Sequence, residues 1–156
     1  MKDKLLKMQK GFTSIQSGFT LIELLVVIAV LAVLASGVLV LINPIDKINA
    51  ANDSKVQQDI GGIGRAAETY AISHGGYYPA ALGDLQTSGE LKVVPTAPSG
   101  YAYTYTALPA ACTAGTTCIS FTITSLLKST KYANQYQKYD SLTNKQCQVA
   151  STATPC

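Results

Sequence analysis

The chain has 156 residues, of which 13 % are charged, and its formal net charge is +3. Four lysines among the first ten residues, less Asp3, account for this whole charge, and eight basic and eight acidic residues follow them. The chain after the leader thus has no excess of positive charge, which excludes a broad electrostatic footprint for DNA or RNA, and we expect no nucleic-acid partner.

A long apolar run follows the basic leader of residues 1–18. From Phe19 to Ile42 only Glu23 is charged, and these roughly 24 residues would form a helix about 36 Å long at 1.5 Å per residue. A bilayer core is about 30 Å thick, so we expect one membrane-spanning helix at residues 19–43. The positive leader predicts an N-terminus in the cytoplasm and a C-terminal part outside the membrane.

Glu23 is unusual because a carboxylate within a membrane span costs on the order of 2.5–3.5 kcal/mol and commonly has a functional partner. A side chain that snorkels to the cytoplasmic interface is the simpler alternative. The run also resembles the apolar region of a secretory signal peptide cut near Ser36, or of an uncleaved signal anchor. It is longer than the usual 7–15-residue apolar region and continues past Ser36, which argues against the signal peptide.

Asn43 and Pro44 mark the expected break at the end of this helix, because proline lacks a backbone donor. Residues 44–76 have apolar side chains three to four positions apart and predict an amphipathic helix. Its predicted apolar face is Ile48, Val56, Ile60, Ile63, Ala67 and Tyr70, and its predicted wet face is Asp46, Lys47, Asp53, Lys55, Asp59, Arg65 and Glu68.

Three glycines in this predicted helix, Gly61, Gly62 and Gly64, indicate either close packing of another segment or local flexibility. The sequence His74-Gly75-Gly76 should end the helix as a glycine C-cap. We interpret His74 as a helix-end cation and not as a catalytic group.

Residues 77–156 predict a small antiparallel sheet. Tyr101–Ala107 alternates with period two and places its tyrosines on one face, and Ile119–Thr124 alternates with Ile119, Phe121 and Ile123 facing the core. The further expected elements are a helical turn at Leu82–Gln86 and strands at Leu91–Val94 and Lys131–Asp140. The polar tail from residue 141 onward is expected to be loose unless a disulfide closes it.

All four cysteines lie in the predicted exported part, where an even count indicates two disulfides. Three connectivities are possible, and the local pairing, Cys112–Cys118 with Cys147–Cys156, is the simplest. A zinc site would need closer cysteine spacing or a Cys/His set, so we expect no metal. The chain shows no nucleophile motif and no phosphate-binding loop, and we expect neither an enzyme nor a cofactor.

The segment Gly18-Phe19-Thr20-Leu21-Ile22-Glu23-Leu24-Leu25 and the apolar run after it resemble the N-terminal signature of type IV prepilins and type II secretion pseudopilins. The resemblance implies cleavage by a prepilin peptidase between Gly18 and Phe19, and N-methylation of Phe19. It also implies that Glu23 pairs with the Phe19 ammonium of a neighbouring subunit during assembly. Gly75-Gly76-Tyr77-Tyr78-Pro79 resembles the turn after the long helix in these proteins.

The fold implied by this resemblance is α+β. It is a pilin fold in which the apolar half of a long N-terminal helix spans the membrane and the amphipathic half packs on a small antiparallel sheet, with disulfide-stapled C-terminal loops. The implied partners are further copies of the chain, a prepilin peptidase and methylase, the assembly platform, other pilins and the membrane. The implied locations are the cytoplasmic membrane for the precursor and the cell surface for the fibre.

One departure from the pseudopilin pattern bears on function. Major pseudopilins carry an acidic calcium-binding loop, whereas Asp140 is the only acidic residue after Glu90 here, so we expect no calcium site. We therefore expect a structural pilus-fibre subunit whose exposed Tyr/Thr surface makes adhesive or other contacts. The alternative is a pseudopilin of a type II secretion or DNA-uptake machine.

Overall fold

The computed structural model describes residues 18–156, apart from the side chains of residues 39–41. Of the predicted leader, only Gly18 belongs to the described residues. The chain divides into two compact units, and the boundary in the sequence falls between Ile42 and Asn43. The first contains helix α1, and the second, Asn43–Cys156, contains every other element and is called the head.

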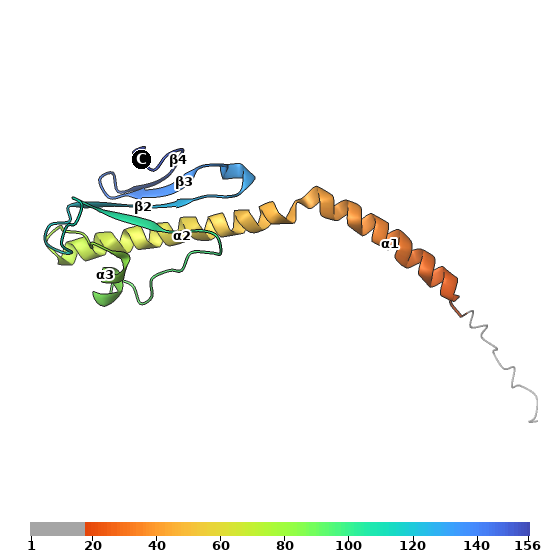
Figure 1. Ribbon diagram of the computed structural model, residues 1–156. Coiled ribbons are helices and arrows are strands. Elements are labelled where there is room, and N and C mark those ends of the chain that lie inside the picture. Colours follow the sequence, from red (N-terminus) through yellow and green to blue (C-terminus); the bar gives the residue numbers. More distant parts are fainter. Residues whose placement is uncertain (1–17) are drawn as a thin grey trace, which may run out of the picture. The chain divides into compact units, whose positions relative to one another are not determined.

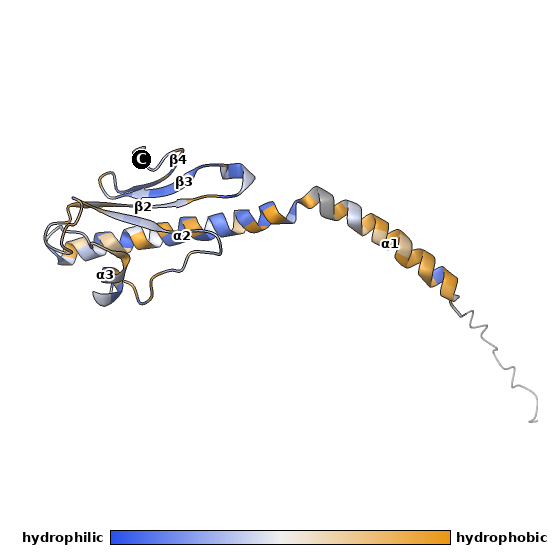
Figure 2. Cartoon of the chain, in the orientation of Figure 1, coloured by the Kyte–Doolittle hydropathy of each residue, from blue (hydrophilic) through white to orange (hydrophobic). Residues whose placement is uncertain are grey.

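Helix α1 (Leu21–Ile42) is apolar along most of its length, as the colouring in Figure 2 shows. Its stretch Leu21–Val38 has a mean hydropathy of 2.8, so it is long and apolar enough to cross a membrane. All of its described side chains are exposed. Helix α1 therefore has no core of its own to pack against.

Helix α2 (Pro44–Ser73) begins directly after Asn43, which adopts a left-handed backbone conformation (φ 45°). The side chain of Asn43 accepts a hydrogen bond from the backbone N–H of Asp46 (3.4 Å) and so caps α2. Pro44 occupies the first helical turn, where a backbone N–H has no partner within the helix, so the missing N–H of proline costs no hydrogen bond. The sequence Asn43-Pro44 thus ends one helix and starts the next.

The head combines α2 with a four-stranded antiparallel sheet in the order β1-β2-β3-β4 (Figure 1). The strands are β1 (Thr104–Leu108), β2 (Ser120–Leu126), β3 (Tyr136–Asp140) and β4 (Lys145–Val149). Two short helices complete it, α3 (Leu82–Thr87) and the 3₁₀ turn η1 (Thr130–Tyr132). The predicted α+β class and the predicted turn near Leu82 are confirmed.

The core lies between α2 and one face of the sheet. Phe121 and Ile123 from β2 and Tyr139 from β3 pack on the helix. The helix contributes Val56, Ile60, Ile63, Ala66, Ala67 and Tyr70 to this core. Two predicted core residues are wrong, because Ile48 is 61 % exposed and Ile119 is 64 % exposed. Ile119 lies before the first residue of β2, so the alternation of that strand does not extend to it.

The tyrosines before and within β1 point toward α2 rather than toward solvent. The hydroxyls of Tyr101 and Tyr103 donate to Asp53 and Asp59, and that of Tyr105 donates to the carbonyl of Pro79. Burial raises the pKa of all three phenols, and the carboxylates add to this for Tyr101 and Tyr103. The prediction that tyrosines form an exposed adhesive surface is therefore wrong for these three residues.

Three further predictions for the sheet region differ in detail from the structure. Leu91–Val94 is irregular, and the N–H of Leu91 bonds to the carbonyl of Leu85 instead of to a strand. Strand β3 starts only at Tyr136, because Thr130–Tyr132 form η1 and a turn separates η1 from the strand. The tail, expected to be loose unless a disulfide closed it, is closed by Cys147–Cys156 and contains β4, which was not predicted because its polar sequence hides its pairing with β3.

Two disulfides staple the head. Cys112–Cys118 closes the loop between β1 and β2, with a Cα–Cα distance of 5.0 Å. Cys147–Cys156 ties the C-terminal tail to β4, with a Cα–Cα distance of 5.7 Å. The tail also accepts a hydrogen bond at the carbonyl of Thr154 from Lys138 (3.0 Å), whose ammonium lies 3.2 Å from Asp140. The tail therefore covers a buried ion pair on the outer face of β3.

Asp53 is fully buried, although the sequence placed it on the wet face of the helix. Its carboxylate accepts hydrogen bonds from the backbone N–H groups of Lys128 and Ser129 (both 2.9 Å) and from Tyr101 (2.8 Å). Burial alone would raise the pKa of Asp53, but these hydrogen bonds outweigh burial and lower it below its usual value. Asp53 thus fastens the segment after β2 to the middle of α2.

The three helical glycines serve different purposes. A Cβ added at Gly64 would lie 2.6 Å from the ring of Tyr139, and one at Gly61 would lie 2.7 Å from Oε1 of Gln146. A Cβ at Gly62 would meet nothing within 4 Å. Close packing of sheet side chains therefore explains two of the glycines but not Gly62.

We predict opposite effects for alanine at two of these positions. Gly64→Ala should destabilise the head by about 1–3 kcal/mol, because Tyr139 must move. Gly62→Ala, the matched control, should stabilise it by up to about 1 kcal/mol through helix propensity. Thermal unfolding of the full chain in detergent micelles, followed by the near-ultraviolet circular dichroism of the tyrosines, measures both. Equal effects of the two variants would contradict the packing explanation.

We further predict that Asp53→Asn destabilises the head by about 2 kcal/mol at pH 7, because three donors lose a charged acceptor. The pKa of Asp53 is lowered in the folded state, so its contribution is present above the unfolded pKa near 3.9 and is lost as the pH falls further. The difference between the two proteins should therefore shrink below about pH 4.

Unfolding curves across pH, with Glu90→Gln as the control, test this prediction. Glu90 makes no side-chain hydrogen bond among residues 18–156, so its variant should match the original chain at every pH. An Asp53→Asn head as stable as the original at pH 7 would show that the carboxylate does not fasten the segment.

Candidate processing and assembly site

The three described residues before α1 are exposed and non-helical. Gly18, Phe19 and Thr20 precede the first helical residue, and Phe19 is 81 % exposed. A Cβ placed on Gly18 would meet no atom within 4 Å. No atom of residues 18–156 therefore covers the Gly18–Phe19 bond on its C-terminal side.

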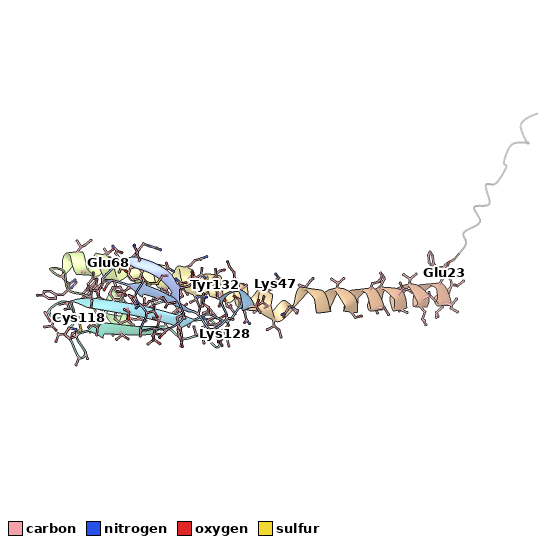
Figure 3. The ribbon with its side chains drawn as sticks, turned by 90° about the horizontal axis from the view of Figure 1, so that it is seen from above. Glu23, Lys47, Glu68, Cys118, Lys128 and Tyr132 are labelled. Carbon is pink, nitrogen blue, oxygen red and sulfur yellow. A yellow bond between two sulfur atoms is a disulfide. The ribbon has the colours of Figure 1, made fainter. Side chains whose placement is uncertain are left out.

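Glu23 lies in the first turn of α1, at the end of the helix labelled in Figure 3. Its backbone N–H donates to the hydroxyl oxygen of Thr20 (3.3 Å), and that hydroxyl donates to Oε2 of Glu23 (3.4 Å). The pair has the spacing of a capping box, in which a threonine and a glutamate three residues later satisfy the start of a helix. The spacing Thr20-x-x-Glu23 signals this local role in the sequence, although the role was not predicted from it.

The contacts of Glu23 leave most of its carboxylate available. No basic side chain lies within ion-pair distance of it in the described range 18–156, and no hydrogen bond joins it to Phe19 there. The positive end of the helix dipole favours a negative charge at this position, by about 0.3–1 kcal/mol. Glu23 thus has no cationic partner among the described residues 18–156.

The other residues singled out by the sequence lie in the head. Asn43 and Pro44 cap α2, and the two disulfides staple loops and tail. His74 stacks on Tyr70 with the ring centroids 3.7 Å apart, which gives it a packing role at the end of α2. No group of three or more potential metal ligands occurs among the residues that the structure describes.

The family comparison agrees with the resemblance stated above. A family model described as the prokaryotic N-terminal methylation motif matches residues 14–39. The matched segment includes the Gly18–Phe19 bond, Glu23 and most of α1. No curated protein and no solved structure matches the chain. The chain therefore carries, at residues 14–39, the leader signature of type IV prepilins and pseudopilins.

Proposed function

We propose that the chain is a structural subunit of a type IV pilus-like fibre, made as a membrane-anchored precursor. The observation that carries the proposal is α1, an apolar helix whose described side chains are all exposed and whose one charge is Glu23. Such a helix needs lipid or other helices around it, because an apolar surface of this extent is not stable in water.

The proposed sequence of events has three steps. The precursor first waits in the cytoplasmic membrane with its N-terminus inside. A prepilin peptidase then cuts between Gly18 and Phe19, the new amine of Phe19 is methylated, and all of the net positive charge leaves with the leader. Processed helices finally gather into a fibre core, with the heads outside and the Phe19 ammonium of one subunit against Glu23 of a neighbour.

Burial drives this assembly, and the ion pair sets its register. A buried carboxylate and a buried ammonium are each costly alone and tolerable together. Because Glu23 has no cationic partner within the described chain, a neighbour that supplies an ammonium gains a specific position along the helix. Two disulfides in the head also fit an oxidising compartment outside the cytoplasm.

A pseudopilin of a secretion or uptake machine would share the same processing and pairing. The two roles differ in the product, because a pilus subunit accumulates in long fibres that can be sheared from cells. Fibres in which this chain is the major component support the pilus role, and short membrane-bound assemblies alone support the pseudopilin role.

We predict a mature N-terminus at Phe19 that carries one added methyl group. Mass spectrometry of the chain, expressed in cells with a prepilin peptidase, measures it directly. Gly18→Leu should abolish the cleavage, because the peptidase no longer meets a glycine at the scissile bond. Gly11→Leu changes the similar Gly11-Phe12-Thr13 sequence and serves as the matched control, which should be cleaved normally. A mature start at Ser36 or at Met1 would refute the proposed processing.

We also predict that Glu23→Ala inserts into the membrane but gives few or no fibres. Removing one partner of a buried ion pair costs about 3–5 kcal/mol, which corresponds to at least a hundredfold loss in assembly. Immunoblots of sheared fibres and of the membrane fraction measure both outcomes. Thr20→Ala removes the local hydrogen bonds but keeps the carboxylate, so its fibres should persist. Normal fibres from Glu23→Ala would contradict the proposed pairing of Glu23 with the Phe19 ammonium.

A further inference from the structure

A polar groove runs along the head between α2 and the β3–β4 side of the sheet, with a volume of about 750 Å³. Neither the membrane helix nor the proposed ion pair involves it. Five of its lining residues are glutamines, and we call it the glutamine groove: Gln57, Gln58, Gln137, Gln146 and Gln148. Its volume lies within the range of about 300–1,000 Å³ that is usual for sites of small ligands.

The helical wall of the groove is one continuous stripe. Ser54, Gln57, Gln58, Gly61 and Arg65 are spaced three, four, seven and eleven positions from the first, which places them on one face of α2. This stripe adjoins the apolar stripe that forms the core, so the helix presents a polar margin beside the sheet. Periodicity in the sequence predicted the apolar stripe and gave no reason to separate this margin from ordinary solvated surface.

The sheet wall is held in place by hydrogen bonds. Gln137 of β3 is 1 % exposed and lies opposite Gln148 of β4, whose Nε2 donates to Oε1 of Gln137 (3.1 Å). Gln146, two residues before Gln148, donates from Nε2 to the backbone carbonyl of Gln57 across the groove (2.7 Å). These bonds fix several amides before any ligand arrives, which lowers the entropy cost of binding.

Gly61 lets the two walls approach. A Cβ at this position would lie 2.7 Å from Oε1 of Gln146 and 3.4 Å from a terminal nitrogen of Arg65. The amide from the sheet and the guanidinium from the helix thus converge over a residue without a side chain. Any larger residue would displace the amide from the groove.

The charge of the groove is as specific as its shape. No carboxylate lines it, and Arg65 is exposed and makes no ion pair within residues 18–156. Primary amides donate and accept hydrogen bonds at once, as hydroxyl groups do, and a guanidinium binds a carboxylate through two parallel hydrogen bonds. The complement of the groove is a molecule with many hydroxyl groups and a carboxylate that can reach Arg65.

We propose that the glutamine groove binds an acidic saccharide of the uronic-acid class. The carboxylate of the sugar pairs with Arg65, and its hydroxyls bond to the amides of Gln58, Gln146 and Gln148. This inference goes beyond the proposed function and does not rest on it, because the groove belongs to a single head and needs no fibre.

Calorimetric titration of the full chain tests the proposal. The chain is held as single subunits in a polyoxyethylene detergent, whose head groups contain no sugar, at about 0.15 M salt to screen the basic leader. Tetragalacturonate is the acidic probe and maltotetraose is the neutral one. We expect tetragalacturonate to bind at least tenfold more tightly than maltotetraose, because only the acidic sugar adds the charged contact with Arg65.

Two matched pairs of variants locate the site. Arg65→Gln should weaken tetragalacturonate binding at least tenfold, whereas Lys92→Gln removes an exposed charge elsewhere and should not change it. Gln58→Ala should weaken both sugars, whereas Gln86→Ala on α3 should weaken neither. Both Arg65→Gln and Lys92→Gln keep the basic leader, so attraction of the acidic sugar to the leader is the same in these titrations.

Three results would overturn the proposed saccharide site. Absence of tetragalacturonate binding at millimolar concentration, equal binding of the two sugars, or equal loss in Arg65→Gln and Lys92→Gln would each exclude an acidic-saccharide site. The groove would then serve contacts between protein chains or only solvent. Because the titration uses unassembled chains, failure here leaves the Phe19 cleavage and the Glu23 pairing untouched.

Discussion

An exposed apolar helix with a single carboxylate is the constraint on which the rest of the chain depends. Helix α1 does not bury its own apolar surface, because all of its described side chains are exposed. Lipid covers it in a membrane, and other copies of the helix cover it in the proposed fibre. The transfer from lipid to protein brings little gain in apolar burial, since lipid tails are as apolar as leucine. Close packing and the polar group at Glu23 must therefore supply the specificity of assembly.

The head solves a different problem, which is to stay folded with few charges and a small core. It uses carboxylates on α2 as acceptors for groups from later segments of the chain. Asp53 holds the segment after β2, and Glu68 accepts from the hydroxyls of Tyr78 (2.9 Å) and Tyr139 (3.3 Å). Burial and the adjacent carboxylate raise the pKa of Tyr78 to about 12, so it remains a neutral donor at any physiological pH. Figure 3 places Glu68 on the part of α2 beside the sheet.

Sequence reasoning succeeded where the signal was local and failed where partners lie far apart in the chain. The apolar run, the break at Pro44 and most of the core face of α2 follow from hydropathy and spacing. Asp53 looked like a solvated residue because its partners, Lys128 and Ser129, are 75 and 76 positions away. Strand β4 was not predicted for a related reason. Its residues are polar, and only their pairing with β3 identifies the segment as a strand. The tyrosines before and within β1 share one face, as predicted, but the alternation alone did not show that this face points toward α2.

The candidate site shows the same division between local and distant information. Gly18, Phe19 and Glu23 were found because a dense local pattern carries them, and the family model covers the same segment. The glutamine groove was not found, because its residues come from α2, β3 and β4 and none is unusual alone. A polar stripe on a helix gains significance only when the opposite wall is known.

The local contacts of Glu23 explain how a precursor tolerates a carboxylate before assembly. At the start of α1 the helix dipole contributes about 0.3–1 kcal/mol, and the long contacts to Thr20 add little. Burial of a carboxylate in the span costs on the order of 2.5–3.5 kcal/mol at the centre and less near the interface. The helix terminus thus offsets part of the cost but not all of it, so the isolated precursor is inserted at a residual disadvantage. In the proposed fibre, an ammonium from a neighbour would remove that remainder, so the residue that makes waiting in the membrane costly would also make assembly favourable.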